Sequence, residues 1–214
     1  MLLVRKTDDF EVTGDGISPN WNQTEWVPLT RVGPGTKTYQ TLVKALYSPT
    51  GMYFLYDCED EKIACTERKD NEHIYDEDVV EVFLWPGQDK LVYFEYELSP
   101  LCVELPLLVP NNNGNFMGWV PWSYEGDRLC RRATSVRGGN KGPQESITGW
   151  MAEFFIPFTL LSGLVNVPPT SGSQWRGNIY RLDYDVVPES HWALSPGTGT
   201  AYHDFEKYGT IEFE

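Results

Sequence analysis

Carboxyl groups and aromatic rings share alternate positions along two neighbouring stretches of the sequence. Residues 79–85 read VVEVFLW and residues 92–98 read VYFEYEL. In these stretches Glu81, Glu95 and Glu97 occupy the same set of alternate positions as aromatic residues. Two carboxyl groups at a defined separation are what glycoside hydrolysis requires. Carboxylates beside exposed rings also suit sugar binding without chemistry, because a ring covers the C–H face of a pyranose while carboxylates accept its hydroxyl hydrogens. Both interpretations, a glycosidase that uses Glu81 and Glu97 and a binding site, fit these residues.

Other chemistry has weaker support in the sequence. The motifs GxSxG, HExxH and GxGxxG and the phosphate-binding P-loop are absent. A haem-binding sandwich would need an axial pair such as His with Met, and no spacing requires one. Residues 56–82 form an acidic stretch whose oxygens could bind a calcium ion, but they lack the EF-hand order, and a plain solvated acidic face is favoured over calcium.

Short apolar segments separated by Gly, Pro, Asn and Asp indicate that these residues lie on antiparallel strands. The turns SPTG and PGQD predict hairpins over residues 41–60 and 77–100, and IPFTLLSGL at 156–164 predicts one short connecting helix. The second hairpin directs one face to a core and the other, with carboxylates and rings, outward. We expect strands near residues 2–6, 25–31, 38–47, 51–57, 79–85, 90–98, 102–108, 129–136, 150–156, 175–186 and 209–214.

This pattern predicts an all-β protein in which residues 1–214 form a single β-sandwich domain of two mostly antiparallel sheets, with a jelly-roll-like or related topology. Long polar loops rich in Asn and Gly at 108–127 and 136–146 interrupt the strands. Such loops commonly carry function. Neither an internal repeat nor a change of composition marks a second domain.

Charge and composition exclude some partners. With 17 Lys and Arg against 31 Asp and Glu, the net charge of −14 repels nucleic acid and anionic lipid. No run of 18 apolar residues predicts membrane insertion, and the apolar part of MLLVRKTDDF is too short for a secretory signal. The four cysteines lack zinc-site spacing, and buried free thiols are favoured over a Cys58–Cys65 disulfide.

Several rings fall in predicted loops or at strand ends, where a sugar site needs them. Three tryptophans within strand patterns are assigned to packing instead: Trp26, Trp150 and Trp175. In the C-terminal stretch, Phe205 and Tyr208 are expected to pack, and Tyr202 to face solvent. The candidate surface rings are Tyr75, Trp85, Trp119, Trp122, Trp192 and Tyr202.

Four segments together resemble carbohydrate-binding module family 9 and its relatives: HIYDEDVVEVFLWPG, YFEYELSP, WRGNIYRLDYD and YHDFEKYGTIEFE, in that order. The resemblance covers most of residues 38–214. It implies a non-catalytic β-sandwich that holds the end of a glycan between two rings, with structural calcium, in bacteria that degrade polysaccharides. Residues 1–37 and the loops at 110–145 match nothing in this pattern.

The resemblance also implies site residues. Tyr75 and Tyr202 match the two rings of the clamp, although the best-known members carry Trp there. Glu81 matches an acid that faces the sugar. The remaining implied ligand-binding residues are Glu97, Ser99, Arg181, Trp192 as a wall, and His203, which we expect to orient the loop.

Two of these carboxylates create an electrostatic requirement. Glu81 and Glu97 on adjacent strands and one face would repel each other and resist burial without a cation between them. The forked guanidinium of Arg181 suits that place, so we predict a Glu81–Arg181–Glu97 cluster beneath Tyr75 and Tyr202.

The sequence therefore predicts a non-catalytic carbohydrate-binding domain that requires no cofactor, with structural calcium as an option. Its expected partner is a mono- or oligosaccharide or a polysaccharide end, and we expect a monomer located outside the cell or in the periplasm. The alternatives are a glycosidase that uses Glu81 and Glu97, and a haem-binding or protein-interaction sandwich.

Overall fold

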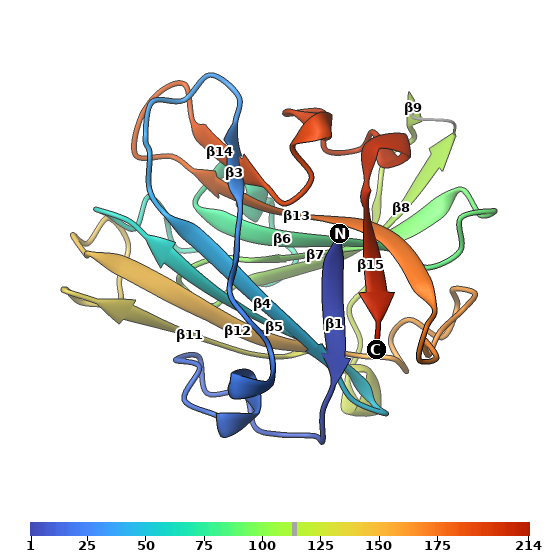
Figure 1. Ribbon diagram of the computed structural model, residues 1–214. Helices are drawn as coiled ribbons and strands as arrows, with labels where there is room; N and C mark the ends of the chain where they lie inside the picture. The colour runs from blue at the N-terminus through green and yellow to red at the C-terminus, as the bar shows by residue number, and fades with distance from the viewer. Residues whose placement is uncertain (113–114) are drawn as a thin grey trace.

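The computed structural model of the chain describes residues 1–112 and 115–214, and its strands form two layers (Figure 1). One layer, sheet A, has the order β10 (Val120–Pro121), β8 (Glu104–Asn112), β7 (Val92–Leu98), β6 (Val79–Trp85), β13 (Gln174–Asp183) and β15 (Gly209–Phe213). The other, sheet B, has the order β4 (Thr41–Tyr47), β5 (Gly51–Glu59), β12 (Gly149–Pro157) and β11 (Arg131–Arg137). The predicted all-β sandwich is confirmed.

Strand β1 (Leu2–Lys6) connects the two sheets at one side. Its first half pairs in parallel with β15, through Leu2 opposite Ile211, and its second half pairs in parallel with β4, through Arg5 opposite Leu46. Beside the main order, β14 (Ser190–Ala193) pairs with β13 and β3 (Thr30–Val32), β2 (Val27–Pro28) pairs with β4, and β9 (Asn115–Phe116) pairs with β8. The other neighbours pair antiparallel, as expected.

The alternation of each strand divides the side chains between two faces. In β6, Val80, Val82 and Leu84 pack between the sheets against residues such as Phe54 and Phe154 of sheet B. Both predicted hairpins, β4–β5 and β6–β7, are present. Burial of this apolar inner layer is the main force that holds the two sheets together.

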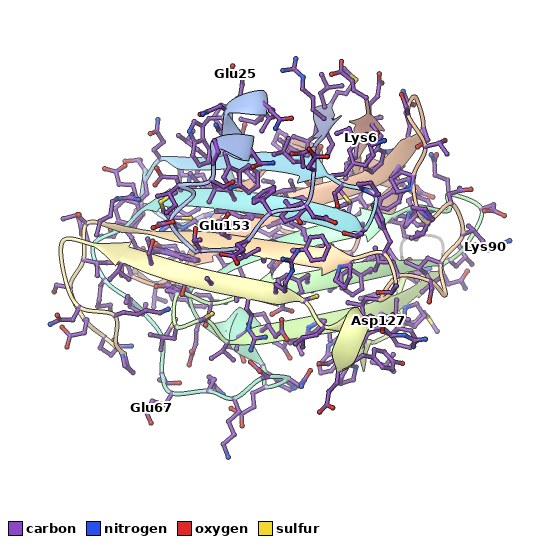
Figure 2. The ribbon with its side chains drawn as sticks, turned by 90° about the horizontal axis from the view of Figure 1, so that it is seen from below. Lys6, Glu25, Glu67, Lys90, Asp127 and Glu153 are labelled. Atoms are coloured by element: carbon purple, nitrogen blue, oxygen red, sulfur yellow. The ribbon has the colours of Figure 1, made fainter. Side chains whose placement is uncertain are left out.

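The N-terminal segment covers the outer face of sheet B, where Trp21 packs against Tyr53 and Phe155. Beneath it lies Glu153 of β12, whose carboxylate accepts hydrogen bonds from Thr13 N at 2.9 Å, Gly14 N at 2.7 Å and Trp21 Nε1 at 2.8 Å. In Figure 2, Glu153 lies over the sheet, whereas Glu67 and Lys90 lie at the periphery. These bonds satisfy a carboxylate that would otherwise be costly to bury.

The C-terminal loops cover part of the outer face of sheet A. Phe205 and Tyr208 are buried there, and the Phe205 ring lies 4.5 Å from that of Trp85. The prediction that these two rings pack is confirmed. They belong to η5 (Phe205–Lys207) and its end; the other short 3-10 helices are η1 (Pro19–Gln23), η2 (Ile74–Asp76), η3 (Gly126–Arg128) and η4 (Pro196–Thr198).

Some local expectations differ from the structure. The helix predicted at 156–164 is a succession of turns, in which Leu160 N donates to Pro157 O at 3.0 Å and Leu164 N to Leu161 O at 2.9 Å. So short a segment gains few bonds for the cost of starting a regular helix. The four cysteines are free, and Cys58, Cys65 and Cys130 are buried. No helix among the described residues is long and apolar enough to cross a membrane.

Candidate functional site

A cavity of about 560 Å³ opens on the outer face of sheet A. Its floor consists of residues from β6 and β7 that point away from the inter-sheet core. The strands pair so that Glu81 lies opposite Glu97 and Phe83 opposite Glu95. Three carboxyl groups therefore lie together on one sheet face, as the alternation of VVEVFLW and VYFEYEL predicts.

These three carboxyl groups are buried, with exposed fractions of 2% for Glu81, 4% for Glu95 and 0% for Glu97. Oε2 of Glu81, Oε2 of Glu95 and both carboxyl oxygens of Glu97 have no hydrogen-bond partner among the described residues. Burial raises the pKa of Glu95 to about 8. Burial, and then the charges of the neighbouring carboxylates, also raise the pKa of Glu81 and Glu97 well above the ordinary value.

One group of rings at the cavity comes from three separate segments of the chain. Tyr75 lies in η2, and its ring is stacked on that of His73 with centroids 5.1 Å apart. The His73 ring also meets the edge of Trp119, at 5.5 Å. Tyr184 Oη donates to Tyr75 O at 2.7 Å and holds this loop over the sheet. Tyr75, Trp119 and Tyr184 all line the cavity.

A second group of rings comes from the loop before β15 and from β9. Tyr202 is half-buried, with its ring 4.6 Å from Tyr180 and its hydroxyl against Nδ1 of His191. The Phe116 ring stacks on His203 at 4.1 Å. Burial lowers the pKa of His203 to about 4, so this ring is neutral at pH 7.

The electrostatic character of the cavity is strongly acidic. Asp76 and Glu189 add two carboxylates to the three of the floor. Glu189 Oε1 lies 3.2 Å from Nε2 of His191, and burial lowers the pKa of that histidine. Within residues 1–112 and 115–214, neither Lys nor Arg lines the cavity.

Five of the residues predicted for the site surround this cavity: Tyr75, Glu81, Glu97, Tyr202 and His203. Their contacts with a ligand remain a prediction. Tyr202 is less free than expected, because its ring and hydroxyl are engaged by Tyr180 and His191.

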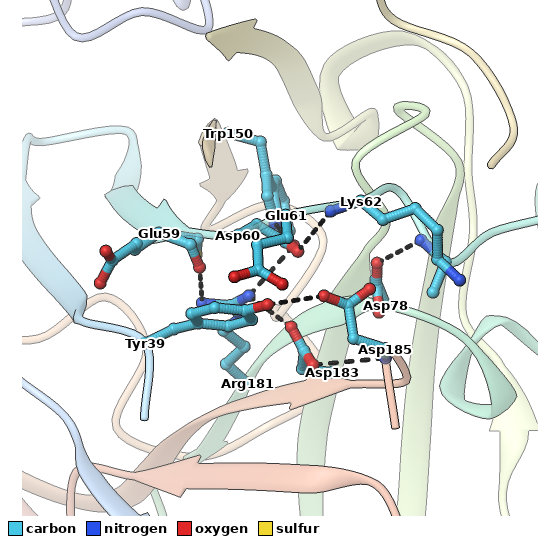
Figure 3. A network of polar contacts seen from close by, with 12 residues as sticks. Tyr39, Glu59, Asp60, Glu61, Lys62, Asp78, Trp150, Arg181, Asp183 and Asp185 are labelled. Carbon is cyan, nitrogen blue, oxygen red and sulfur yellow. Dashed lines mark hydrogen bonds and ion pairs between the residues drawn. The ribbon is translucent and has the colours of Figure 1, made fainter. Parts of the chain in front are cut away.

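The predicted Glu81–Arg181–Glu97 cluster is wrong. In the pairing of β13 with β6, Tyr180 lies opposite Glu81 and Arg181 opposite Val80, so Arg181 points to the inner face. There its Nη2 donates to Asp60 Oδ2 at 3.0 Å and to Asp183 Oδ2 at 2.7 Å (Figure 3). A register that differs by one residue moves a side chain to the other face of the sheet.

Trp192 and Ser99 are also outside the cavity. Trp192 is in β14, whose alternation places its ring in the inter-sheet core, 4.9 Å from the Arg181 guanidinium, and presents its neighbour His191 to the cavity. Ser99 is buried at the end of β7, where its Oγ accepts from Val103 N at 3.2 Å and stabilises a turn. The expectation of a Trp192 wall and a Ser99 contact is corrected accordingly.

Sequence reasoning did not assign several residues that line the cavity. The sequence could have predicted Glu95, since it lies two positions before Glu97 on the same strand. It could not have predicted Phe116 and His191, because the position of each depends on a short strand that the apolar pattern did not predict. Trp119, one of the candidate surface rings, also lines the cavity. The unassigned residues are Pro34, Asp76, Phe83, Glu95, Leu107, Phe116, Leu182, Tyr184, Glu189, His191 and Thr200.

A second acidic group lies around Arg181, at one end of the inter-sheet layer. Carboxylate oxygens of Asp60, Asp183 and Asp185 lie within 4.8 Å of one another. Arg181 is paired with two of them, and Tyr39 Oη donates to Asp185 Oδ2 at 2.7 Å. A calcium ion takes six or more oxygens. Because Arg181 already supplies the compensating charge, this set of residues does not fit a calcium site.

Rings from separate loops above buried, unpaired carboxyl groups on a rigid sheet define a binding domain for a small polar ligand with apolar faces. Residues 12–214 match the model of the family described as carbohydrate family 9 binding domain-like. The chain belongs to this family, and the prediction of a non-catalytic carbohydrate-binding domain is confirmed by it. No curated protein matches the chain.

Solved structures agree on the fold. A Bacteroides uniformis protein assigned a carbohydrate-binding function is 19% identical, with a TM-score of 0.80, and the match covers 100% of this chain and 98% of that one. A family 9 carbohydrate-binding module from Caldicellulosiruptor kristjanssonii in complex with cellotriose is 17% identical, with a TM-score of 0.65 and coverage of 100% and 93%. A module of that family and organism in complex with glucose is 16% identical, with a TM-score of 0.63 and coverage of 99% and 95%.

Proposed function

We propose that the cavity over β6 and β7 is the sugar-binding site. The observation that carries this proposal is the set of carboxyl oxygens on the floor, at Glu81, Glu95 and Glu97, that have no hydrogen-bond partner within residues 1–112 and 115–214 and lie beneath rings of separate loops. Buried polar atoms without partners are costly, and ligand hydroxyls would satisfy them. The ring faces of Tyr75 and Tyr202 would cover the C–H faces of the sugar.

The size of the cavity and its neighbours support a short ligand. A volume of about 560 Å³ suits one or a few sugar units rather than a long stretch of polysaccharide. The Caldicellulosiruptor kristjanssonii modules are complexes with cellotriose and with glucose. The proposed ligand is therefore a mono- or oligosaccharide, or the end of a polysaccharide chain.

Calorimetric titration of the wild type and Tyr202→Ala with glucose, cellotriose and other short oligosaccharides tests this site. We expect Tyr202→Ala to weaken binding about tenfold, which corresponds to ~1.4 kcal/mol. The matched control is Tyr124→Ala, an exposed tyrosine that does not line the cavity. Sugar binding that is absent from the wild type, or equal in both variants, would contradict the proposal.

The biological setting forms a second part of the proposal. The domain would act outside the cell or in the periplasm of a bacterium that uses polysaccharides, because these polymers are too large to enter the cell intact. It would act as a monomer. It would also act as a single domain over residues 1–214, because the N-terminal segment is bonded to Glu153 of the sandwich.

We further propose that this domain needs no structural calcium at Asp60, Asp183 and Asp185. The support is the buried guanidinium of Arg181, which bonds to Asp60 and Asp183, and Lys37 Nζ, which lies 3.5 Å from Asp185 Oδ2. These cations provide the positive charge that a metal ion would otherwise bring.

A further inference from the structure

We propose that the cavity prefers a sugar unit that carries a free primary ammonium group, such as a glucosamine residue, over a neutral sugar. This inference rests on the proposed function, since it names the class of sugar for the same site. The observation behind it is the juxtaposition of five carboxyl groups with aromatic rings around one cavity that, in the described part of the chain, neither Lys nor Arg lines.

The carboxyl groups of the floor exceed what neutral hydroxyls require. Glu81, Glu95 and Glu97 lie on adjacent strands, and four of their buried oxygens have no partner within the described residues. Each group is at most 4% exposed, and burial raises the pKa of all three, which favours their protonated forms at pH 7 because their ionised forms would repel each other with little screening by water. A cation at this floor would favour the ionised forms and, as an ammonium group, would donate hydrogen bonds to several of their oxygens at once.

The described part of the chain supplies no such cation at this place. Arg181, the nearest candidate by sequence, is bonded to Asp60 and Asp183 on the other face of the sheet. Of the two histidines at the cavity, His203 and His191, burial lowers the pKa of both, which favours their neutral forms at pH 7. A ligand is then the remaining source of positive charge.

The shape of the site favours an organic ammonium group over a metal ion. Among the described residues, the set that gathers three potential metal ligands within 4.8 Å is Asp60, Asp183 and Asp185, and it does not include the floor carboxyl groups. Those groups thus do not form a compact metal cage. They lie below Tyr75, Trp119, Phe116 and Tyr202 in a volume that holds a sugar ring. Aromatic faces also attract cations.

An ammonium group on a sugar combines both requirements. Its three N–H donors would face the carboxyl oxygens of the floor, and its positive charge would favour the ionised form of these groups, which only accepts, while the sugar ring would lie against the aromatic walls. An N-acetylated amino sugar has the same ring but lacks the charge, and glucose lacks the nitrogen altogether. Glucose and glucosamine therefore isolate the effect of the charge at nearly constant shape, and N-acetylglucosamine tests the nitrogen without its charge but with an added acetyl group.

Calorimetric titration of the wild type with glucosamine, glucose and N-acetylglucosamine at low ionic strength tests the inference. We expect glucosamine to bind about tenfold more tightly than either neutral sugar. In Glu95→Gln the affinity ratio of glucosamine to glucose should fall toward one, whereas the control Glu206→Gln, an exposed residue that does not line the cavity, should keep the wild-type ratio. Circular dichroism checks that both variants fold.

The outcomes separate this inference from the function on which it rests. Equal binding of all three sugars by the wild type, or tighter binding of glucose, overturns the preference and leaves the sugar site standing. Binding of no sugar overturns both proposals. A further titration with putrescine tests the sugar part: binding as tight as that of glucosamine would show recognition of the charge alone and overturn the assignment to an amino sugar.

Discussion

Two groups of buried carboxyl groups lie on opposite faces of the same sheet, and they differ in whether a positively charged side chain is paired with them. On the inner face, Asp60 and Asp183 share the guanidinium of Arg181, which is completely buried with them. On the outer face, Glu81, Glu95 and Glu97 surround the floor of an open cavity, and four of their oxygens have no partner in the described part of the chain. Strand β13 contributes to both environments, through Arg181 inward and Tyr180 outward.

The difference teaches how one fold separates stability from binding. Burial raises the pKa of Asp60 to about 7, and the charge of Arg181 opposes that rise. The inner group is closed, and both Asp60 and Asp183 are paired with Arg181, although Nε of Arg181 and Oδ1 of Asp185 have no hydrogen-bond partner among the described residues. In the outer group, the carboxyl oxygens that have no partner among the described residues lie beside aromatic rings, where a ligand can reach them. Natural proteins tolerate such local cost at functional sites.

Removal of the inner cation should have the largest effect. Arg181→Met leaves Asp60 and Asp183 buried without the cation that pairs with both of them, which we expect to lower the free energy of unfolding by about 3–5 kcal/mol. Urea denaturation followed by circular dichroism measures this. The control Arg137→Met breaks a partly exposed pair with Asp57 and should cost about 1 kcal/mol or less. Similar losses in both variants would show that the inner network is not specially stabilising.

Removal of one outer carboxyl group should act in the opposite direction and depend on pH. Glu95 has a pKa of about 8 in the folded protein, whereas an unfolded Glu titrates at about 4.3. Between these values the folded protein holds a proton that the unfolded chain releases, so the wild type loses stability as pH rises through this window.

Glu95→Gln abolishes the pH dependence of stability that Glu95 causes, because the amide of glutamine does not titrate. Between pH 5 and pH 9, the free energy of unfolding of the wild type should fall by on the order of a few kcal/mol more than that of the variant. The plot of stability against pH should therefore be flatter for the variant. Thermal unfolding at several pH values measures this, with Glu206→Gln as an exposed control. A parallel pH dependence of wild type and Glu95→Gln would contradict the raised pKa.

Of the changes considered, calcium should have the smallest effect on stability. If Arg181 compensates the inner group, then excess calcium chloride or EDTA should shift the midpoint of thermal unfolding by less than about 1 °C. A rise of several degrees with calcium, abolished by EDTA and retained in Glu95→Gln, would place a metal ion at the inner group and contradict the role proposed for Arg181.

Much of the fold followed from local patterns. The eleven predicted strands correspond to strands of the structure, because alternating apolar residues and turn residues act over short distances. The short strands β9, β10 and β14 have too few residues for such a pattern. The helix predicted at 156–164 was wrong, since Pro157 completes strand β12 and the following residues form turns.

The sequence by itself determined which residues share a strand face, and thus that Glu95 and Glu97 point the same way. Period-two alternation is a property of a single strand and needs no partner. Only the tertiary structure decided which face Arg181 and Trp192 occupy, because this depends on the pairing of β13 with β6 and on β14. The same holds for Phe116 and Trp119, which reach the cavity from a loop distant in sequence. Register and loop placement arise from contacts between segments, and no single segment encodes them.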